Sequence, residues 1–318
     1  MKKFHIFVTG LFGFILGCIV TLCLIKTNKT DVCSKARLEK RETGYQYINP
    51  LLECEYTDKI GATEQTILQK NIKKILQQYS DIEFGIYYRD LTNGPWFGID
   101  EDVPFAPQSL LKLPVALAYY KLAENNPQII NKKIAYNKPL DKTNTDDALE
   151  LNQEYSVEYL IHRMLVLSDN TAFNLLVMNL PSDYIQKVHQ DLGITFPDES
   201  TPEDFITVKT YASIFRVLYN SSYLPRKSSE IILQLLAQSE FSEGLVSGVP
   251  NEITVAHKFG ILSSDSPTTK NQLHDCAIVY HPQKPYILCV MSKGKDRNKL
   301  IDAMQNISKN VFDEINKE

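Results

Sequence analysis

The stretch "FAPQSLLKLPVALAYY", residues 105–120, decides how the rest of this sequence is interpreted. It opens with polar residues and proline and continues as a strongly apolar run, which predicts a core helix. Ser109 stands three residues before Lys112, and residues three apart share one face of a helix. Ser109 is therefore either the first polar residue of a core helix or a nucleophile with its base one turn further on.

The chemistry of a serine nucleophile fits the surroundings of this pair. A serine hydroxyl is a poor nucleophile until a base removes its proton. A lysine can be that base when burial or a nearby cation lowers its pKa, and Leu110, Leu111 and Leu113 supply apolar surface. The start of a helix also offers backbone N–H groups for an oxyanion hole. The spacing alone is weak evidence, because Ser292 and Lys295 repeat it in "SKGK".

A second polar group lies in "VLSDNTAFNLL", residues 166–176. Ser168, Asp169 and Asn170 follow one apolar helical run and open another. Serine, aspartate and asparagine are also ordinary residues of helix caps and turns. The group is consistent with a functional loop but does not establish one.

A third group lies in "ITVAHKFGI", residues 253–261, which reads as a β-branched strand. Lys258 and Gly260 share one face of such a strand, while Phe259 takes the other. A glycine without a side chain lets a ligand approach the backbone. The alternative is an edge strand with a solvated lysine.

Taken together and in this order, the three groups resemble the signature Ser-x-x-Lys, Ser-Asp-Asn, Lys-Thr-Gly of class A β-lactamases and penicillin-binding proteins. The likeness is closest to class A β-lactamase-like serine hydrolases and extends over about residues 60–316, including "LELNQEYSVEYLIHRMLVLSDNTAFNLL" and "GLVSGVPNEITVAHKFG". It implies an α+β fold of the β-lactamase/transpeptidase type. An antiparallel sheet lobe flanked by terminal helices would adjoin an all-helical lobe, with the active site in the cleft between them.

The resemblance implies a role for each motif residue, without a metal or an organic cofactor. The implied catalytic set comprises the nucleophile Ser109, its base Lys112, the proton shuttle Ser168 and the cation Lys258. The implied substrate-binding set comprises Asn170, Gly260 and Ile261. Asn170 would hold the substrate's side-chain amide, and the N–H groups of Ser109 and Ile261 would form the oxyanion hole. Asp169 would be structural.

The first departure from the family pattern is Phe259, which stands where the family has threonine or serine. The hydroxyl that would bind a substrate carboxylate is therefore missing from the strand. Other hydroxyls close by in the sequence are candidates to replace it, namely those of Ser263, Ser264, Thr268 and Thr269.

The second departure is the absence of the Glu-x-x-Leu-Asn loop, whose glutamate activates the deacylating water in class A β-lactamases. The corresponding interval reads "LGITFPDESTPEDFITV", and its glutamates Glu199 and Glu203 are not followed by Leu-Asn. The "ELN" at 150–152 precedes Ser168 and lacks the spacing. These departures leave three functions open: hydrolysis of β-lactams or related acyl-D-Ala amides, a D-Ala-D-Ala carboxypeptidase or penicillin-binding protein, and an acylated sensor that does not turn over.

The amino terminus predicts a membrane anchor. Twenty residues without a charge run from Ile6 to Ile25, the length that a spanning helix needs. We predict a signal anchor over 1–25 that contacts the membrane through residues 4–25, a juxtamembrane linker over 26–58 and a hydrolase domain over 59–318. A lipoprotein site at Cys18 is the alternative. The short amino-terminal tail favours an extracytoplasmic domain.

Composition and cysteine spacing add further expectations. A net charge of −4 gives no basic field for nucleic acid, and we expect a monomer that acts on a small β-lactam or a peptidoglycan-like peptide. Outside the membrane Cys33 and Cys54 could form a disulfide. Cys276 and Cys289 fall on two strand-like runs that place them opposite each other, and we favour two buried thiols. A helix capped by Thr63, with an apolar stripe that includes Ile67, Leu68, Ile72 and Ile75, is expected to precede the first strands.

Overall fold

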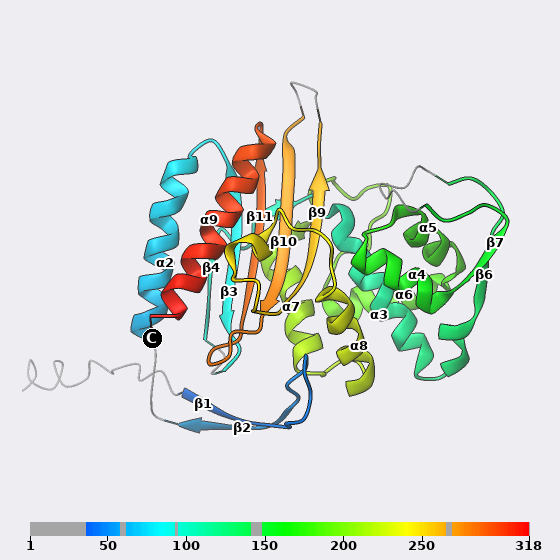
Figure 1. Ribbon diagram of the computed structural model, residues 1–318, viewed down its shortest axis with the longest axis horizontal. Coiled ribbons are helices and arrows are strands. Elements are labelled where there is room, and N and C mark those ends of the chain that lie inside the picture. The colour runs from blue at the N-terminus through cyan, green and yellow to red at the C-terminus, as the bar shows by residue number, and fades with distance from the viewer. Residues whose placement is uncertain (1–35, 58–61, 93–94, 141–147, 265–268, 318) are drawn as a thin grey trace, which may run out of the picture.

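A five-stranded antiparallel sheet forms the centre of the molecule, with strand order β4-β3-β11-β10-β9 (Figure 1). The computed structural model describes residues 36–57, 62–92, 95–140, 148–264 and 269–317. The strands of this sheet are β3 (Glu83–Asp90), β4 (Trp96–Ile99), β9 (Val255–Leu262), β10 (Asn271–Val279) and β11 (Tyr286–Gly294). The sequence predicted strands in all of these regions, from alternation in β3 and β4 and from β-branched or apolar runs in β9, β10 and β11.

Two helices from opposite ends of the chain, α2 (Ala62–Leu76) and α9 (Arg297–Ile315), cover one face of the sheet (Figure 1). Most of the predicted apolar stripe of α2 is buried, including Ile72, but the side chain of Ile67 is 47% exposed. Thr63 lies inside α2 rather than before it, so the prediction that it caps the helix is wrong.

A helical lobe adjoins the other face of the sheet. Its helices are α3 (Lys112–Ala123), α4 (Val157–Val166), α5 (Asn170–Asn179), α6 (Ser182–Leu192), α7 (Val208–Tyr219) and α8 (Arg226–Leu236). One apolar core runs without interruption from this face of the sheet into the lobe, through buried residues of α7 and α3. The expected α+β architecture is therefore confirmed. Short antiparallel pairs interrupt the helices: β5 (Pro104–Phe105) with β8 (Ile206–Thr207), and β6 (Lys133–Tyr136) with β7 (Gln153–Ser156).

The segment predicted as a linker contains regular structure. β1 (Ala36–Arg41) and β2 (Leu51–Thr57) pair as a two-stranded antiparallel sheet. Between them, the backbone N–H groups of residues 46–48 donate to the carboxylate of Glu230 on α8, at 2.9–3.2 Å. These hydrogen bonds to a carboxylate hold residues 46–48 on the helical lobe. The contact joins residues far apart in the sequence, so local pattern does not reveal it.

The predicted membrane segment over residues 4–25 lies outside the described residues, as do Cys33 and the side chain of Cys54. Among the helices that the structure describes, none combines the length and the apolarity needed to span a membrane. The anchor and the Cys33–Cys54 pairing therefore stay predictions.

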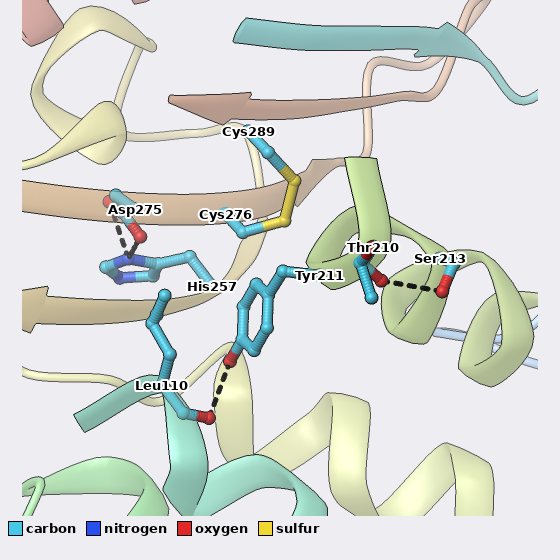
Figure 2. The surroundings of a disulfide bond; sticks show 8 residues. All are labelled: Leu110, Thr210, Tyr211, Ser213, His257, Asp275, Cys276 and Cys289. Carbon is cyan, nitrogen blue, oxygen red and sulfur yellow. Dashed lines mark hydrogen bonds and ion pairs between the residues drawn. A yellow bond between two sulfur atoms is a disulfide. The ribbon is translucent and has the colours of Figure 1, made fainter. Parts of the chain in front are cut away.

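The structure joins Cys276 to Cys289 in a disulfide, so the expectation of two separate thiols is wrong. Their predicted placement is confirmed: they stand directly opposite in the β10–β11 ladder, with Cα atoms 3.9 Å apart. Cross-strand partners of this kind bring side chains into contact. Figure 2 shows the disulfide beside Tyr211 of α7, whose hydroxyl donates to the Leu110 carbonyl at 3.1 Å. The disulfide therefore lies next to Tyr211, the side chain that holds the turn carrying Ser109.

Candidate active site

A tight turn presents Ser109. After β5 the chain enters a 3-10 turn, η2 (Gln108–Leu111), and α3 begins at Lys112. Gln108 has φ of +49°, a left-handed conformation that costs a non-glycine residue on the order of 1 kcal/mol. The turn is held by the Leu110 N–H, which donates to the Pro107 carbonyl at 2.9 Å. The expected helical start at Ser109 is confirmed, with a 3-10 first turn.

The edge strand β9 packs directly against this turn at Gly260. A Cβ atom on Gly260 would lie 3.1 Å from the Pro107 carbonyl oxygen and 3.2 Å from Leu110 Cγ. Both distances are tight, so any side chain there would push the Ser109 turn away from the sheet. A ligand was expected to approach the backbone at Gly260, and the structure places the turn that carries Ser109 against it.

The amine of Lys112 brings the first two motifs together. Its side chain is buried, and its Nζ lies 2.9 Å from Ser109 Oγ and 2.6 Å from Asn170 Oδ1. It also donates to Ser168, at 2.5 Å from the carbonyl oxygen and 3.1 Å from Oγ. The predicted nucleophile and base are thus within hydrogen-bonding reach of each other.

The Ser-Asp-Asn loop between α4 and α5 is held in place by Asp169. This buried carboxylate caps α5 by accepting from the N–H groups of Thr171 and Ala172, and Arg163 Nε donates to it at 2.7 Å. An aspartate cap is worth about 1 kcal/mol. Ser168, beside it, has φ of +55°. Asp169 is therefore placed to fix the loop that presents Ser168 and Asn170, as the resemblance implied.

The third motif enters from the edge of the sheet. Lys258 of β9 has no exposed surface, and its Nζ donates to Ser168 Oγ and to the Phe259 carbonyl, both at 3.1 Å. Strand residues two apart direct their backbone groups to the same edge, so the Ile261 N–H points the same way as the Phe259 carbonyl. Of the seven predicted site residues, five side chains form one hydrogen-bonded group, and Gly260 and Ile261 adjoin it through the backbone.

Burial sets the charge of the two lysines. It lowers the pKa of Lys112 to about 8, and the negative charge of Asp169 offsets part of this effect. Burial lowers the pKa of Lys258 well below its usual range, and the nearby Lys112 lowers it further. A neutral lysine amine is therefore available near neutral pH, as a general base requires.

This pKa gives a direct expectation for the pH dependence of acylation. The base form of Lys112 is the neutral amine, and its fraction rises with pH and passes through one half where the pH equals the pKa of about 8. The acylation rate constant with a reporter penicillin should therefore rise as the pH approaches and passes this pKa, and it should level off once the amine is fully neutral. Stopped-flow measurement across the range, with melting curves to exclude unfolding, gives the profile. A rate that falls or stays flat as pH rises would contradict Lys112 as the base.

Other residues singled out by sequence do not join the group. The Ser292 hydroxyl is buried in the sheet and donates to the Leu273 carbonyl at 2.7 Å, so the second Ser-x-x-Lys copy is structural. Glu199 and Glu203 are exposed, and the carboxylate that acts on the pKa of Lys112 is that of Asp169. In the described part of the chain, no cluster of three or more His, Cys, Asp or Glu residues could hold a metal ion.

Sequence reasoning missed two features of the site. The Phe259 ring lies over Lys258 Nζ, with 4.1 Å between the nitrogen and the ring centroid. The same ring stacks on Phe241 at a centroid distance of 4.0 Å. From the sequence, Phe259 was expected on the strand face opposite Lys258 and was noted for the hydroxyl that it lacks, so a ring contact with Lys258 was not expected. No local pattern pointed to Phe241, which is distant in sequence.

Comparison with known proteins agrees with this geometry. The model of the beta-lactamase enzyme family matches residues 67–315. No curated protein matches the chain. Among solved structures, PBP-A is 19% identical, covers 80% of this chain and 97% of its own, and superposes with a TM-score of 0.70. An acyl-enzyme complex of a PBP-A variant with penicillin G gives the same identity and coverage with a TM-score of 0.68.

A class A β-lactamase from Bacteroides cellulosilyticus DSM 14838 is 17% identical, covers 81% of this chain and all of its own, and has a TM-score of 0.71. At these identities the solved structures show a shared fold. The family match covers most of the chain and all three motifs. The chain therefore belongs to the beta-lactamase enzyme family and is a serine hydrolase of the class A β-lactamase-like type.

Proposed function

We propose that the chain is a membrane-anchored hydrolase that opens the amide of β-lactams or of related acyl-D-Ala-type peptides through an ester on Ser109. The observation that supports this most is the position of Lys112 Nζ, 2.9 Å from Ser109 Oγ. A buried amine with a pKa of about 8 can accept the hydroxyl proton without a metal or a histidine.

The proposed steps use the side chains in sequence. The neutral Lys112 amine takes the Ser109 proton while Oγ bonds to the carbonyl carbon of the substrate. The N–H groups of Ser109 and Ile261 stabilise the oxyanion. Ser168 Oγ, 3.1 Å from both lysine amines, then relays the proton to the leaving nitrogen as the carbon–nitrogen bond breaks. With a peptide the products are an ester on Ser109 and a free amine, whereas with a β-lactam the amine stays attached to the ester because the broken bond lies in a ring. Water later hydrolyses the ester.

Hydrolysis of the Ser109 ester is expected to be the slow step. Deacylation needs a base that activates a water beside the ester. Asp169 is the carboxylate that acts on Lys112, and its oxygens are already engaged by Arg163 and by the amino terminus of α5. This supports the second candidate, a penicillin-binding protein or sensor that holds its acyl group. A variant of PBP-A forms an acyl-enzyme complex with penicillin G, which is a precedent for choosing a penicillin as the probe.

We expect a fast first turnover followed by a long-lived ester. A chromogenic β-lactam should give a burst of about one product per enzyme, and intact-protein mass spectrometry should show the adduct for minutes to hours. Rapid steady turnover with no adduct would contradict this expectation. In that case Glu199→Gln and Glu203→Gln are compared, and loss of turnover in only one of them identifies the base.

The location of the enzyme is part of the same proposal. The twenty uncharged residues from Ile6 to Ile25 support an anchor, and the short tail before them supports an extracytoplasmic domain. Protease treatment of intact cells, followed by membrane fractionation, tests both points. Release of the full-length chain in the soluble fraction would contradict the anchor.

A further inference from the structure

The amine of Lys258 is enclosed on every side in this structure. Its residue has no exposed surface, so no water-sized group touches it. Two hydrogen bonds go to Ser168 Oγ and to the Phe259 carbonyl, and the Phe259 ring covers Nζ at 4.1 Å. The ring therefore occupies space beside Nζ that a substrate group would need in order to reach this amine.

A second ring holds the first one in place. Phe241, in the segment between α8 and η4 (Leu245–Gly248), stacks on Phe259 with ring planes 20° apart. The neighbouring Glu240 N–H donates to the Val166 carbonyl at the end of α4 at 3.2 Å, which ties this segment to the helical lobe. Moving the Phe259 ring aside would break this stacking, so displacement by a ligand carries a cost.

Of the hydroxyls considered as replacements, those of Ser263 and Ser264 follow the end of β9, and that of Thr268 lies outside the described residues. β9 ends at Leu262, and the N–H of Ser264 donates to Asn271 Oδ1 at 2.8 Å. Among the residues that the structure describes, the hydroxyl within hydrogen-bonding distance of Lys258 Nζ is that of Ser168, which the proposed proton relay already uses. A carboxylate that approached Lys258 would thus meet the face of an aromatic ring, where a charged group loses hydration without gaining a donor.

We propose that Phe259 is a specificity-determining residue that keeps carboxylates away from Lys258, so that the preferred acyl donor is a neutral amide or ester at the position facing β9. This inference rests on the proposed acyl transfer at Ser109. Lys258 then acts mainly on Ser168, and carboxylate-bearing penicillins acylate the enzyme more slowly than neutral analogues.

The test compares a penicillin with its methyl ester, which carries the same acyl group and ring without the charge. In Phe259→Thr, the ratio of the acylation rate constants, carboxylate over ester, should rise by about tenfold or more, the effect of a hydrogen bond to a charged group. Phe259→Tyr is the matched control, because it keeps the ring over Lys258 and should keep the wild-type ratio. Melting curves check that each variant is folded.

Three outcomes overturn the inference. An unchanged ratio in Phe259→Thr, or an equal rise in Phe259→Tyr, would show that the ring does not exclude carboxylates. The third outcome is a Lys258→Ala variant that slows acylation by the penicillin more than acylation by its methyl ester, because the carboxylate would then reach Lys258 despite the ring. When Lys258→Ala is combined with Phe259→Thr, the larger loss of acylation rate is expected with the penicillin. If neither probe acylates Ser109 in the wild-type enzyme, the proposed function itself fails.

Discussion

Ser109→Ala is expected to abolish covalent labelling by a fluorescent penicillin. In the proposed reaction the hydroxyl oxygen of Ser109 forms the ester, and alanine has no atom in its place. Ser109 is partly exposed and its side chain makes one hydrogen bond, to Lys112, so the free energy of unfolding should change by about 1 kcal/mol or less. Labelling on a denaturing gel and a melting curve measure the two effects.

Ser292→Ala is the matched control for this variant. Ser292 belongs to the second Ser-x-x-Lys copy, but its hydroxyl is buried and bonded to the Leu273 carbonyl. Its removal should lower stability and leave labelling intact. Undiminished labelling in Ser109→Ala, or loss of labelling in Ser292→Ala in a folded protein, would contradict the assignment.

Lys112→Arg is expected to slow acylation by about 10²–10⁴-fold, the usual contribution of a general base. Arginine keeps the positive charge and can donate to Ser168 and Asn170, but it does not lose its proton in proteins. The comparison with Lys112→Ala separates proton removal from positioning. Both variants should be slow if Lys112 is the base, as measured by stopped-flow acylation on protein shown to be folded.

Near wild-type acylation in Lys112→Arg would show that the residue acts only by positioning Ser168 and Asn170. The wild-type rise with pH toward a pKa of about 8 should also disappear in Lys112→Arg, because the titrating amine has been removed. Persistence of the same pH profile in this variant would assign the titration to another group.

Local pattern predicted most of the elements, and the resemblance to class A β-lactamase-like serine hydrolases supplied the chemical group. Helical periodicity specifies helices such as α9, which bury one face, whereas the central strands β10 and β11 are buried on both faces and read as apolar runs. The motif residues Ser109, Lys112, Ser168 and Lys258 were identifiable because their order and spacing resemble the three motifs of that family. The structure brings these four side chains together, as the resemblance implied.

Features that depend on distant contacts were not predictable in this way. The sequence placed Cys276 opposite Cys289, as the ladder of β10 and β11 does, but that placement alone does not decide between a disulfide and two thiols. The docking of residues 46–48 depends on one carboxylate, that of Glu230, in a helix far along the chain. Phe259 was noted for the hydroxyl that it lacks, while its ring contact with Lys258 becomes visible only in three dimensions.

The position of the acyl group on the wild-type protein tests the central claim most directly. The full-length protein is incubated with a penicillin, digested, and its peptides are sequenced by tandem mass spectrometry. We predict one adduct with the mass of the intact penicillin, on the peptide that carries "APQSLLK" and localised to Ser109. An adduct on any other residue, or no adduct together with no hydrolysis of penicillin or its methyl ester, would contradict the account.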